Sequence, residues 1–476
     1  MMESMIIENG VTFKELEKNI FSWVCQMGRQ FTADFLERYD QMLMKNRDKN
    51  KYRHKGSRQT TIKTVYGEVT YRRNIYEVRE EDGSRHFVYL LDETLELNHV
   101  GLISTNLAEL LVKGITEMSY RACAEKVSEM TGQSISAMGV WNVIQALGET
   151  VCKEENELVE QHKAGHLHGT KEAPVLFEEA DGVYIHLQGE DRKKSRKGKA
   201  EIKVGIAYDG WKKAGNGRYE LPDKVVVAGF AEAKKFHEYR EAAIAKTYNL
   251  DEVSQRILNA DGASWIKKVK DKSTCFQLDP FHRNKAAREK LHNRKAVRAV
   301  MEMLESGEIE ELFVYLEAYK NSLSEEHEIR DAEELLKYYK NNREGLLPYQ
   351  SQVLDLPVHP EGLEYRNMGT MENHVWSVIA RRMKHNHTSW SKQGGNHLAK
   401  LLAKKCSGKL YEVTEKLKRP VFMEETVEEL YGEIRMSAKA PKKEGKGYEY
   451  PAIGHMVGLE GQVRGDRRRL LAMAGF

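Results

Sequence analysis

The chain has 476 residues, enough for roughly three or four domains and a sizeable buried core. Its 75 lysine and arginine residues nearly balance 72 acidic residues, so the net charge of +3 gives no overall indication of a nucleic-acid partner. Five scattered cysteines without a CxxC pair argue against a disulfide framework or zinc knuckle and favour reduced thiols. No stretch of 18 apolar residues could span a membrane as a helix, and the first ten residues lack a signal pattern, so we expect a cytoplasmic protein.

Charge is nevertheless segregated along the chain. Acidic residues concentrate at 304–334 and 424–433. Basic clusters recur at 45–58, 191–203, 381–384 and 440–447. A nearly neutral chain with this pattern can present a basic face, although each cluster is equally compatible with an ordinary solvated surface.

Residues 11–46 are predicted to form one helix, because apolar residues recur at intervals of three and four. These residues are Phe13, Leu16, Ile20, Val24, Met27 and Phe31. The segment 60–76 instead alternates and is rich in β-branched and aromatic residues, which predicts a hairpin turning near Gly67. With a third strand at 86–91, residues 51–96 would form a small β-rich module.

Residues 103–150 return to a helical pattern. Ser119 can cap a helix over 120–130, and Ser136 can cap a second helix that runs through Leu147 and ends at Gly148. A glycine-containing turn at 131–134 separates the two. Such a helix-turn-helix pattern indicates either DNA binding or a helical hairpin within the core.

From residue 173 the pattern changes to strands that alternate with helices. Strands are predicted at 174–187, 201–208, 224–230, 254–259 and 273–278, and helices at 235–248, 263–270 and from 281. Short loops join the first three strands, which should be antiparallel, whereas strands separated by helices should be parallel. Gly182, within the first strand, marks a candidate bulge.

The remaining chain is mostly helical in pattern. Residues 283–346 are charged, contain no proline and read as helices. A long helix is predicted to begin near Thr370, followed by helices at 396–405 and 423–434. The tail from residue 438 lacks periodicity and contains several glycine, proline and lysine residues, so we expect it to be flexible.

Two aspartates occupy matching positions on the predicted strands. Asp181 lies on the first strand and Asp261 just past the fourth, and each precedes a glycine that lets the backbone turn and a ligand approach closely. If those strands are neighbours, the carboxylates face each other and repel unless a cation lies between them. Mg²⁺ needs only a few carboxylates beside water and phosphate oxygens. An Asp-Gly pair is also a common turn, which is the alternative explanation.

Glu372 is the third candidate acid and opens the helix near Thr370. It shares one predicted helix face with Trp376, Ile379 and Met383, and that face would pack on the sheet and bring the glutamate to its edge. Two metal ions held by three such acids could activate the attacking oxygen and stabilise the leaving oxygen of a phosphoryl transfer. A glutamate near a helix start is otherwise a common cap.

This order of elements and acids resembles the Asp-Asp-Glu transposases of bacterial insertion sequences, most closely the ISLre family and more distantly Mutator-type transposases. The likeness covers roughly 170–410, and the segments 61–71 and 383–394 also look like that family. The resemblance implies an α/β fold with an RNase H-like mixed sheet. It also implies Mg²⁺ (alternatively Mn²⁺) on Asp181, Asp261 and Glu372, with cleavage of DNA at element ends and strand transfer into a target.

Mutator-like families also carry a Cys-or-Asp, two residues, then His after the second catalytic aspartate. Asp279-Pro-Phe-His282 matches that motif, and 283–346 fits the helical insertion that follows it. The resemblance implies that Asp279 and His282 support the site or the DNA. A strand end and a hydrogen-bonded histidine are the alternative explanation of the same residues.

Basic residues beside these acids are candidates for contacts with DNA phosphates. They are Lys193, Lys194, Arg196 and Lys197 between the first two strands, and Arg381, Arg382 and Lys384 on the Glu372 helix. A solvated hairpin is equally compatible with the first group. His385, His387 and Trp390 follow the helix and could contact DNA or form a packed loop.

The predicted organisation places helical and small β-rich DNA-binding modules before the catalytic core. The ranges are 1–50 (helical), 51–98 (β-rich), 99–165 (helix-turn-helix-like), 170–282 (first part of the core), 283–346 (all-α insertion), 347–435 (second part of the core and C-terminal helices) and 436–476 (basic tail). The expected partners are double-stranded DNA and further copies of the chain, since two DNA ends must be joined, and helix 11–46 is a candidate contact. Two alternatives stay open: a non-catalytic DNA-binding regulator derived from a transposase, and an RNase H-like nuclease that cuts without joining.

Overall fold

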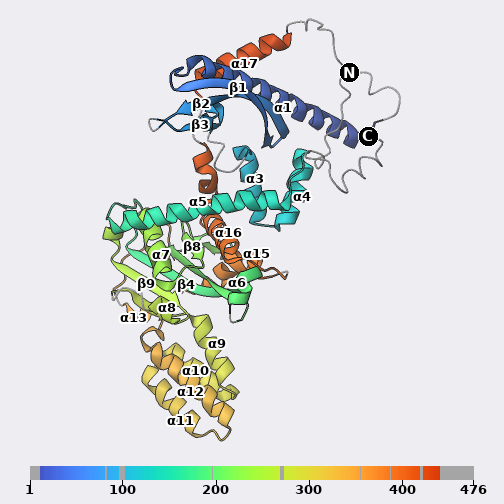
Figure 1. Ribbon diagram of the computed structural model, residues 1–476. Helices are drawn as coiled ribbons and strands as arrows, with labels where there is room; N and C mark the ends of the chain where they lie inside the picture. Colours follow the sequence, from blue (N-terminus) through green and yellow to red (C-terminus); the bar gives the residue numbers. More distant parts are fainter. Residues whose placement is uncertain are drawn as a thin grey trace. The chain divides into compact units, whose positions relative to one another are not determined.

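The protein is described by a computed structural model that covers residues 11–80, 83–95, 102–195, 197–267, 273–353, 355–385, 387–418 and 422–439 (Figure 1). The chain divides into two compact units, Met1–Met423 and Glu424–Phe476. The second unit is described through one helix, α17 (Glu424–Lys439). The predicted tail beyond this helix lies outside the described residues.

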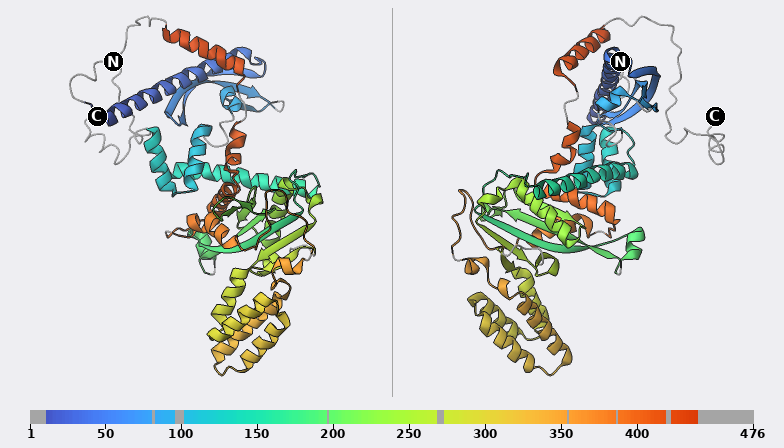
Figure 2. Two further views of the ribbon diagram at one scale, coloured as in Figure 1. Left: turned by 180° about the vertical axis from the view of Figure 1, so that it is seen from behind. Right: turned by 60° about the vertical axis from the view of Figure 1, so that its left-hand side comes forward.

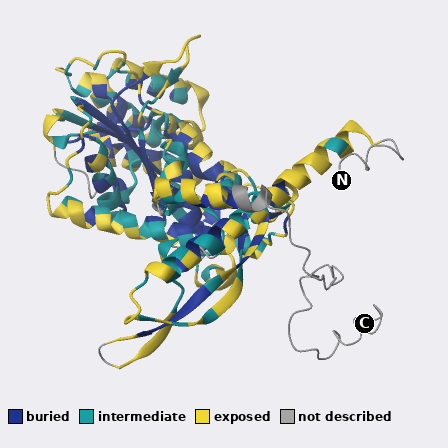
Figure 3. Ribbon diagram, turned by 90° about the horizontal axis from the view of Figure 1, so that it is seen from above, coloured by how far each residue is buried: buried dark blue, intermediate teal, exposed yellow. Residues whose placement is uncertain are grey.

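The N-terminal elements are a long helix and a three-stranded sheet. Helix α1 (Phe13–Asn46) begins at a capping box between Thr12 and Glu15, and its N-terminal half is largely exposed (Figure 3). Strands β1 (Tyr52–Thr64), β2 (Gly67–Arg79) and β3 (Arg85–Val88) form an antiparallel sheet in that order. The predicted hairpin is therefore confirmed.

The predicted third strand over 86–91 was too long. The chain turns into a short helix, α2 (Leu90–Thr94), after β3. This turn buries Leu91 completely and places Asp92 in an ion pair with Arg73 of β2. Burial of one apolar and one paired side chain thus outweighs continuation of the strand.

Three helices follow, α3 (Thr105–Ile115), α4 (Tyr120–Thr131) and α5 (Ala137–Lys163). Ser119 and Ser136 cap α4 and α5 as predicted, and Gly132 ends α4 with a positive φ of 64°. The predicted end at Gly148 was wrong, because α5 continues fifteen residues further to Lys163. A Cβ at Gly148 would lie 2.3 Å from the Cβ of His397, so this glycine permits close approach of α16 (Lys392–Cys406).

A five-stranded mixed sheet forms the centre of the chain. Its order is β10-β9-β4-β5-β8, with the strands β4 (Val175–His186), β5 (Lys199–Tyr208), β8 (Val225–Gly229), β9 (Gln255–Ala260) and β10 (Cys275–Leu278). The β4–β5 and β5–β8 pairs are antiparallel, and the β4–β9 and β9–β10 pairs are parallel, as predicted. The first and fourth strands of this sheet in chain order, β4 and β9, are therefore neighbours.

The candidate bulge at Gly182 is absent, since β4 pairs with β5 in one unbroken register from Phe177↔Tyr208 to His186↔Lys199. A glycine is needed at position 182 for a different reason. A Cβ at Gly182 would lie 2.2 Å from Oε1 of Glu201 on β5, so the position provides clearance for a charged neighbour. The predicted basic hairpin between β4 and β5 contains a short helix, α6 (Gly189–Lys194).

Helices cover both faces of this sheet (Figures 1 and 2). Phe177 of β4 packs in a core cluster with residues of α5 and α16, whereas the adjacent Leu176 packs with Phe236 of α7 (Ala233–Thr247) on the opposite face. The chain segment that connects β5 to β8 contains a separate two-stranded ribbon, β6 (Lys212–Lys213) and β7 (Tyr219–Glu220). The predicted helix over 263–270 is described as α8 (Ser264–Lys267), and 268–272 lie outside the described residues.

The predicted all-α segment forms a helical bundle that follows β10 (Figure 2). Its helices are α9 (Pro280–Lys290), α10 (Arg294–Ser306), α11 (Ile309–Asn321) and α12 (Glu326–Asn341). A short helix, α13 (Tyr349–Gln352), leads back towards the sheet. Val300, Leu312 and Leu336 are among the buried residues of a core that the bundle shares with Phe276 of β10.

The helix that carries Glu372 is interrupted by a wider turn. It comprises α14 (Met371–Val375), a π-helical turn (Trp376–Ala380) and α15 (Arg381–Met383). The predicted packing face was wrong in part: Ile379 and Met383 are buried, but Trp376 is 52% exposed. The π-helical turn spans Trp376–Ala380 and changes the angular spacing of side chains. Ile379 and Met383 therefore do not share a face with Glu372 and Trp376, which are both exposed. The helix α16 and a 3₁₀ segment (Leu410–Lys418) complete this unit.

Among the described residues, no helix combines the length and the apolar character that crossing a bilayer requires.

Candidate metal centre

The adjacent interior strands β4 and β9 carry the two candidate aspartates, Asp181 within β4 and Asp261 just past the end of β9. Parallel pairing sets Ala180 opposite Ala260, so the next residues, Asp181 and Asp261, emerge at neighbouring positions. Oδ1 of Asp181 accepts a hydrogen bond from the backbone N–H of Gly182 at 2.7 Å, and Oδ1 of Asp261 accepts one from Ala263 at 2.8 Å. Both side chains line one small pocket, which agrees with the prediction that the two carboxylates face each other.

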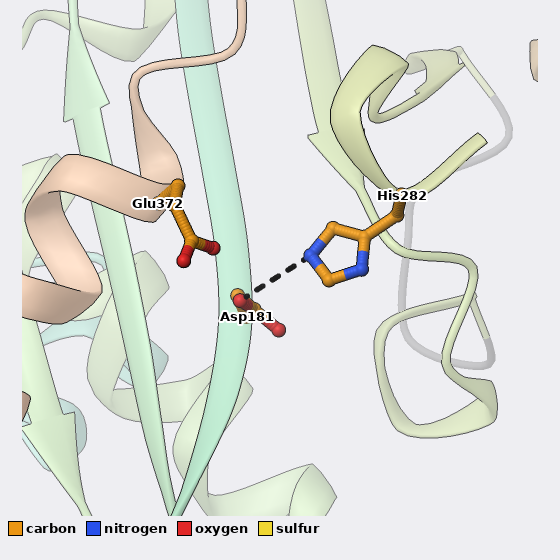
Figure 4. A group of neighbouring side chains, drawn as sticks. All are labelled: Asp181, His282 and Glu372. Carbon is orange, nitrogen blue, oxygen red and sulfur yellow. Dashed lines mark ion pairs between the residues drawn. The ribbon is translucent and has the colours of Figure 1, made fainter. Parts of the chain in front are cut away.

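Two further helices bring their first turns to the same pocket. Glu372 comes from α14, and His282 comes from α9, whose first turn follows β10. Asp181, His282 and Glu372 each offer a possible ligand atom, and these atoms lie within 4.8 Å of one another (Figure 4). Nε2 of His282 lies 3.7 Å from Oδ2 of Asp181. Asp261 and Asp279 also line the pocket, together with the apolar residues Ala180, Ala260 and Met371.

The electrostatics of the pocket reflect crowded carboxylates. Asp181 raises the pKa of His282, because the carboxylate favours the protonated imidazole. Burial raises the pKa of Asp261, and the charge of Asp181 adds to this effect. Burial also raises the pKa of Glu201, with Asp261 and Asp181 acting in the same direction and Lys203 opposing them. The pocket therefore combines mutually repelling acids with one imidazole.

The donor set fits a divalent cation. Carboxylate oxygens suit Mg²⁺ and Mn²⁺, and an imidazole nitrogen suits the transition metals better than it suits Mg²⁺. Asp181 and Glu372 could supply oxygens, Asp261 lies beside them, and Nε2 of His282 could serve as a ligand or neutralise Asp181 by ion pairing. Of the predicted metal-binding residues, the structure groups Asp181 and Glu372 with His282, while Asp261 lines the same pocket.

A layer of buried polar residues continues inward from Asp279, which itself lines the pocket. Oδ1 of Asp279 caps α9 by accepting the backbone N–H of His282 at 3.1 Å, and its Oδ2 accepts from Nδ2 of Asn259 at 2.8 Å. Nδ2 of Asn259 also lies 3.0 Å from Oε2 of Glu179, which is fully buried. Burial raises the pKa of Glu179, and hydrogen bonds from Thr370, Tyr208 and Asn259 oppose that shift.

Sequence reasoning missed Glu179 and Glu201. One signal in the sequence could have found the first of them: Glu178 and Glu179 interrupt an apolar strand, and a strand covered on both faces leaves its carboxylates buried, where they need partners. For Glu201 the sequence shows only a charged residue at the start of a strand.

The predicted phosphate-binding residues differ in their surroundings. Lys193, Lys194 and Lys197 are exposed, and Nζ of Lys193 lies 2.6 Å from Glu190. Arg196 lies outside the described residues. Arg381 is exposed and pairs with Glu117 at 3.2 Å. Lys384 is also exposed.

Arg382 and Trp390 are used inside the protein. Nε of Arg382 donates to the carbonyl oxygen of Ile115 at 2.8 Å, and the guanidinium lies 5.2 Å from the ring centre of Trp390. Trp390 is 8% exposed, and its Nε1 donates to the carbonyl oxygen of Met383 at 2.9 Å. Of the two interpretations of the segment after the Glu372 helix, packing therefore applies to Trp390.

Comparison with known proteins gives one family. A family model described as an uncharacterised protein family, UPF0236, matches residues 6–420. A UPF0236 protein of Caldanaerobacter subterraneus subsp. tengcongensis is 27% identical over 427 residues, which cover 86% of this chain and 81% of the relative. A second protein of that bacterium is 26% identical and is covered to 77%. A UPF0236 protein from the vanSb 3′ region of Streptococcus gallolyticus is 23% identical, with 86% of each chain covered. Because the family match spans most of the sequence, the chain belongs to UPF0236.

Proposed function

We propose that this protein is a transposase of a bacterial insertion sequence, which cleaves DNA at the element ends and transfers the strands to a target. One observation carries the proposal: Asp181, Asp261, His282 and Glu372, from four separate segments of the chain, line a single pocket beside the adjacent strands β4 and β9 of the mixed sheet. The sheet order, with β4 between antiparallel β5 and parallel β9, supports an RNase H-like core of the kind that the sequence resemblance implies.

The proposed chemistry is an in-line phosphoryl transfer without a covalent enzyme intermediate. When bound, divalent cations activate the attacking oxygen and stabilise the leaving oxygen. Asp181, Asp261 and Glu372 would hold Mg²⁺ or Mn²⁺, with Asp279 and His282 in support. In the first step water attacks phosphorus and the P–O3′ bond breaks. The released 3′-hydroxyl then attacks a phosphodiester of the target strand, and the target's own 3′-oxygen leaves.

The exposed basic residues near this core suit a DNA partner. Lys193 and Lys194 lie on α6, which joins the metal-site strand β4 to β5, and Lys197 precedes β5. Arg381 and Lys384 are exposed at the end of the Glu372 helix. Their ammonium and guanidinium groups would neutralise backbone phosphates. Since two element ends must be brought together, we also propose that the protein works as a homo-oligomer on DNA.

The names of the relatives give independent support. The name of one Caldanaerobacter protein joins eleven designations, that of a second joins four and that of a third joins two. Several designations for one protein in one bacterium are what repeated copies of a mobile element would produce. A regulator or housekeeping nuclease has no comparable reason to be repeated.

The proposal is tested with duplex DNA carrying the ends that flank this gene. We expect the wild-type protein to nick these ends and join them to target DNA when Mg²⁺ or Mn²⁺ is supplied, and to stop when the metal is chelated. Asp261→Ala should retain DNA binding and lose both steps. Cutting without joining would replace the proposal with a nuclease, and binding without cutting would replace it with a DNA-binding regulator.

A further inference from the structure

Glu179 is a fully buried carboxylate with a dense set of hydrogen-bond donors. Its Oε1 accepts from the hydroxyls of Tyr208 and Thr370, each at 2.6 Å. Its Oε2 accepts from Nδ2 of Asn259 at 3.0 Å and from the backbone N–H groups of Thr370 and Met371 at 3.1 and 3.2 Å. The backbone and amide groups can only donate, so this environment requires an acceptor.

These contacts fix the start of the helix that carries Glu372. The N–H groups of Thr370 and Met371 are among those that a helix leaves without internal partners at its N-terminus. The side chain of Thr370 makes no cap bond of its own and donates to Glu179 instead. Glu179 therefore caps the segment 371–383 from a different element, the strand β4. Glu372 is the next residue after the two capped positions.

Glu179 and Asp181 also share one strand and one side of it, since residues two apart on a strand point the same way. A rigid strand thus presents one carboxylate to the pocket and uses the other to hold the helix that brings Glu372 to the pocket. Asp279 likewise caps α9, the helix that carries His282. The side-chain amide of Asn259 donates to both capping carboxylates, Glu179 and Asp279. The two helix-borne residues of the site are held by one connected layer.

We propose that Glu179 is a positioning residue, which places Glu372 beside Asp181 by capping its helix. The inference rests on the proposed metal site, although the structural part of it can be measured without a metal. Replacement of a residue that orients a metal ligand typically weakens metal binding by about 10–100-fold. Because Glu179 acts through Glu372, its effect on metal binding should vanish once Glu372 has been replaced.

Glu179→Met and Glu179→Gln separate positioning from general loss of stability. Methionine removes both acceptors. Glutamine keeps a carbonyl oxygen for the backbone N–H groups, and its NH₂ can donate to the hydroxyls of Tyr208 and Thr370, which can rotate to accept. Glu178→Gln is the matched control, because Glu178 is equally buried on the same strand but pairs with Arg240 and Arg256 on the opposite side.

The first measurement is amide hydrogen exchange of the full-length variants. We expect Glu179→Met to accelerate exchange in the peptide that covers 370–376, and Glu179→Gln and Glu178→Gln to leave this peptide protected. Exchange in the α10 peptide should be unchanged in all three. If Glu179→Met does not fold, adding Thr370→Val to Glu179→Gln removes one of the accepting hydroxyls and should expose the same peptide. Unchanged protection at 370–376, or acceleration spread equally over α10, would overturn the inference.

The second measurement is Mn²⁺ affinity by electron paramagnetic resonance. Glu179→Met and Glu372→Gln should each weaken binding by about 10–100-fold, and the double variant should be no weaker than Glu372→Gln alone. If the double variant weakened Mn²⁺ binding by the product of the two single effects, Glu179 would act independently of Glu372, contrary to the inference. If the wild type binds no Mn²⁺, the proposed function fails, and hydrogen exchange alone decides whether Glu179 positions the helix.

Discussion

Gly148→Ala tests the close approach of α5 and α16, two helices that pack on the face of the sheet to which Phe177 points. In an open helix interior this change would add about 1 kcal/mol of stability, because alanine favours the helix. Here the new Cβ would lie 2.3 Å from Cβ, 2.6 Å from Cγ and 3.1 Å from Cα of His397. Ordinary contact begins near 3.4 Å, so the helices must separate by about 1 Å. Overpacking of a core typically costs about 1–3 kcal/mol.

The gain offsets part of the cost, so we expect Gly148→Ala to lower the free energy of unfolding by up to about 2 kcal/mol, measured by urea denaturation. Gly28→Ala in α1 is the matched control, because its Cβ would meet only the ring of Tyr66 at 3.4 Å. The control should be neutral or stabilising. A Gly148→Ala protein as stable as Gly28→Ala would refute the argument, since the contact with α16 would then have no energetic consequence.

Three further predictions concern the site and its surroundings. Asp261→Asn should stabilise the metal-free protein to thermal unfolding as the pH rises above about 4, where an aspartate of the unfolded chain is ionised. The raised pKa of Asp261 means that its ionisation costs folding free energy there, so an unchanged or lower melting temperature would contradict this prediction. Burial and Lys224 lower the pKa of His374 to about 4. The free energy of unfolding should therefore fall by up to about 3 kcal/mol as the pH drops from about 6.5 to about 4. His374→Gln should flatten this pH profile, measured by urea denaturation. The double variant Lys193→Ala/Lys194→Ala should weaken DNA binding and reduce its salt dependence without changing the free energy of unfolding, because both lysines are exposed. Arg382→Ala should destabilise the fold, because it removes the hydrogen bond to Ile115. An equal loss of stability in the two proteins would show that the lysines are structural.

The sheet and the two aspartates could be predicted because their signals are local. One Asp-Gly pair lies within an apolar strand and the other just past one, and the lengths of the connections separate antiparallel from parallel neighbours. The pairing of β4 with β9 confirms that the strands of Asp181 and Asp261 are adjacent. Glu372 followed from the start of a late helix. Each of these predictions depends on a few neighbouring residues.

The features that could not be predicted depend on residues distant in sequence. Gly148 looked like a helix end because glycine is a frequent terminator, and only the position of His397 explains it. Trp376 was placed on the packed face by a regular helical period, which the π-helical turn changes. Arg382 belongs to a basic cluster in the sequence, yet its hydrogen bond to Ile115 directs it inward. In all three positions tertiary contacts decide the outcome.

The charge of the pocket explains why its residues require so much support. Asp181, Asp261, Asp279 and Glu372 line the pocket, whereas His282 is the one basic side chain among the lining residues. The charges of Asp261 and Asp181 also help to raise the pKa of the nearby Glu201. Mutual repulsion would move side chains on flexible segments apart. Here Asp181 lies on the central strand β4, and the helices of Glu372 and His282 are capped by Glu179 and Asp279. Under the proposed function, the protein would hold these repelling groups in place before a cation arrives, so the cation would not have to order them when it binds.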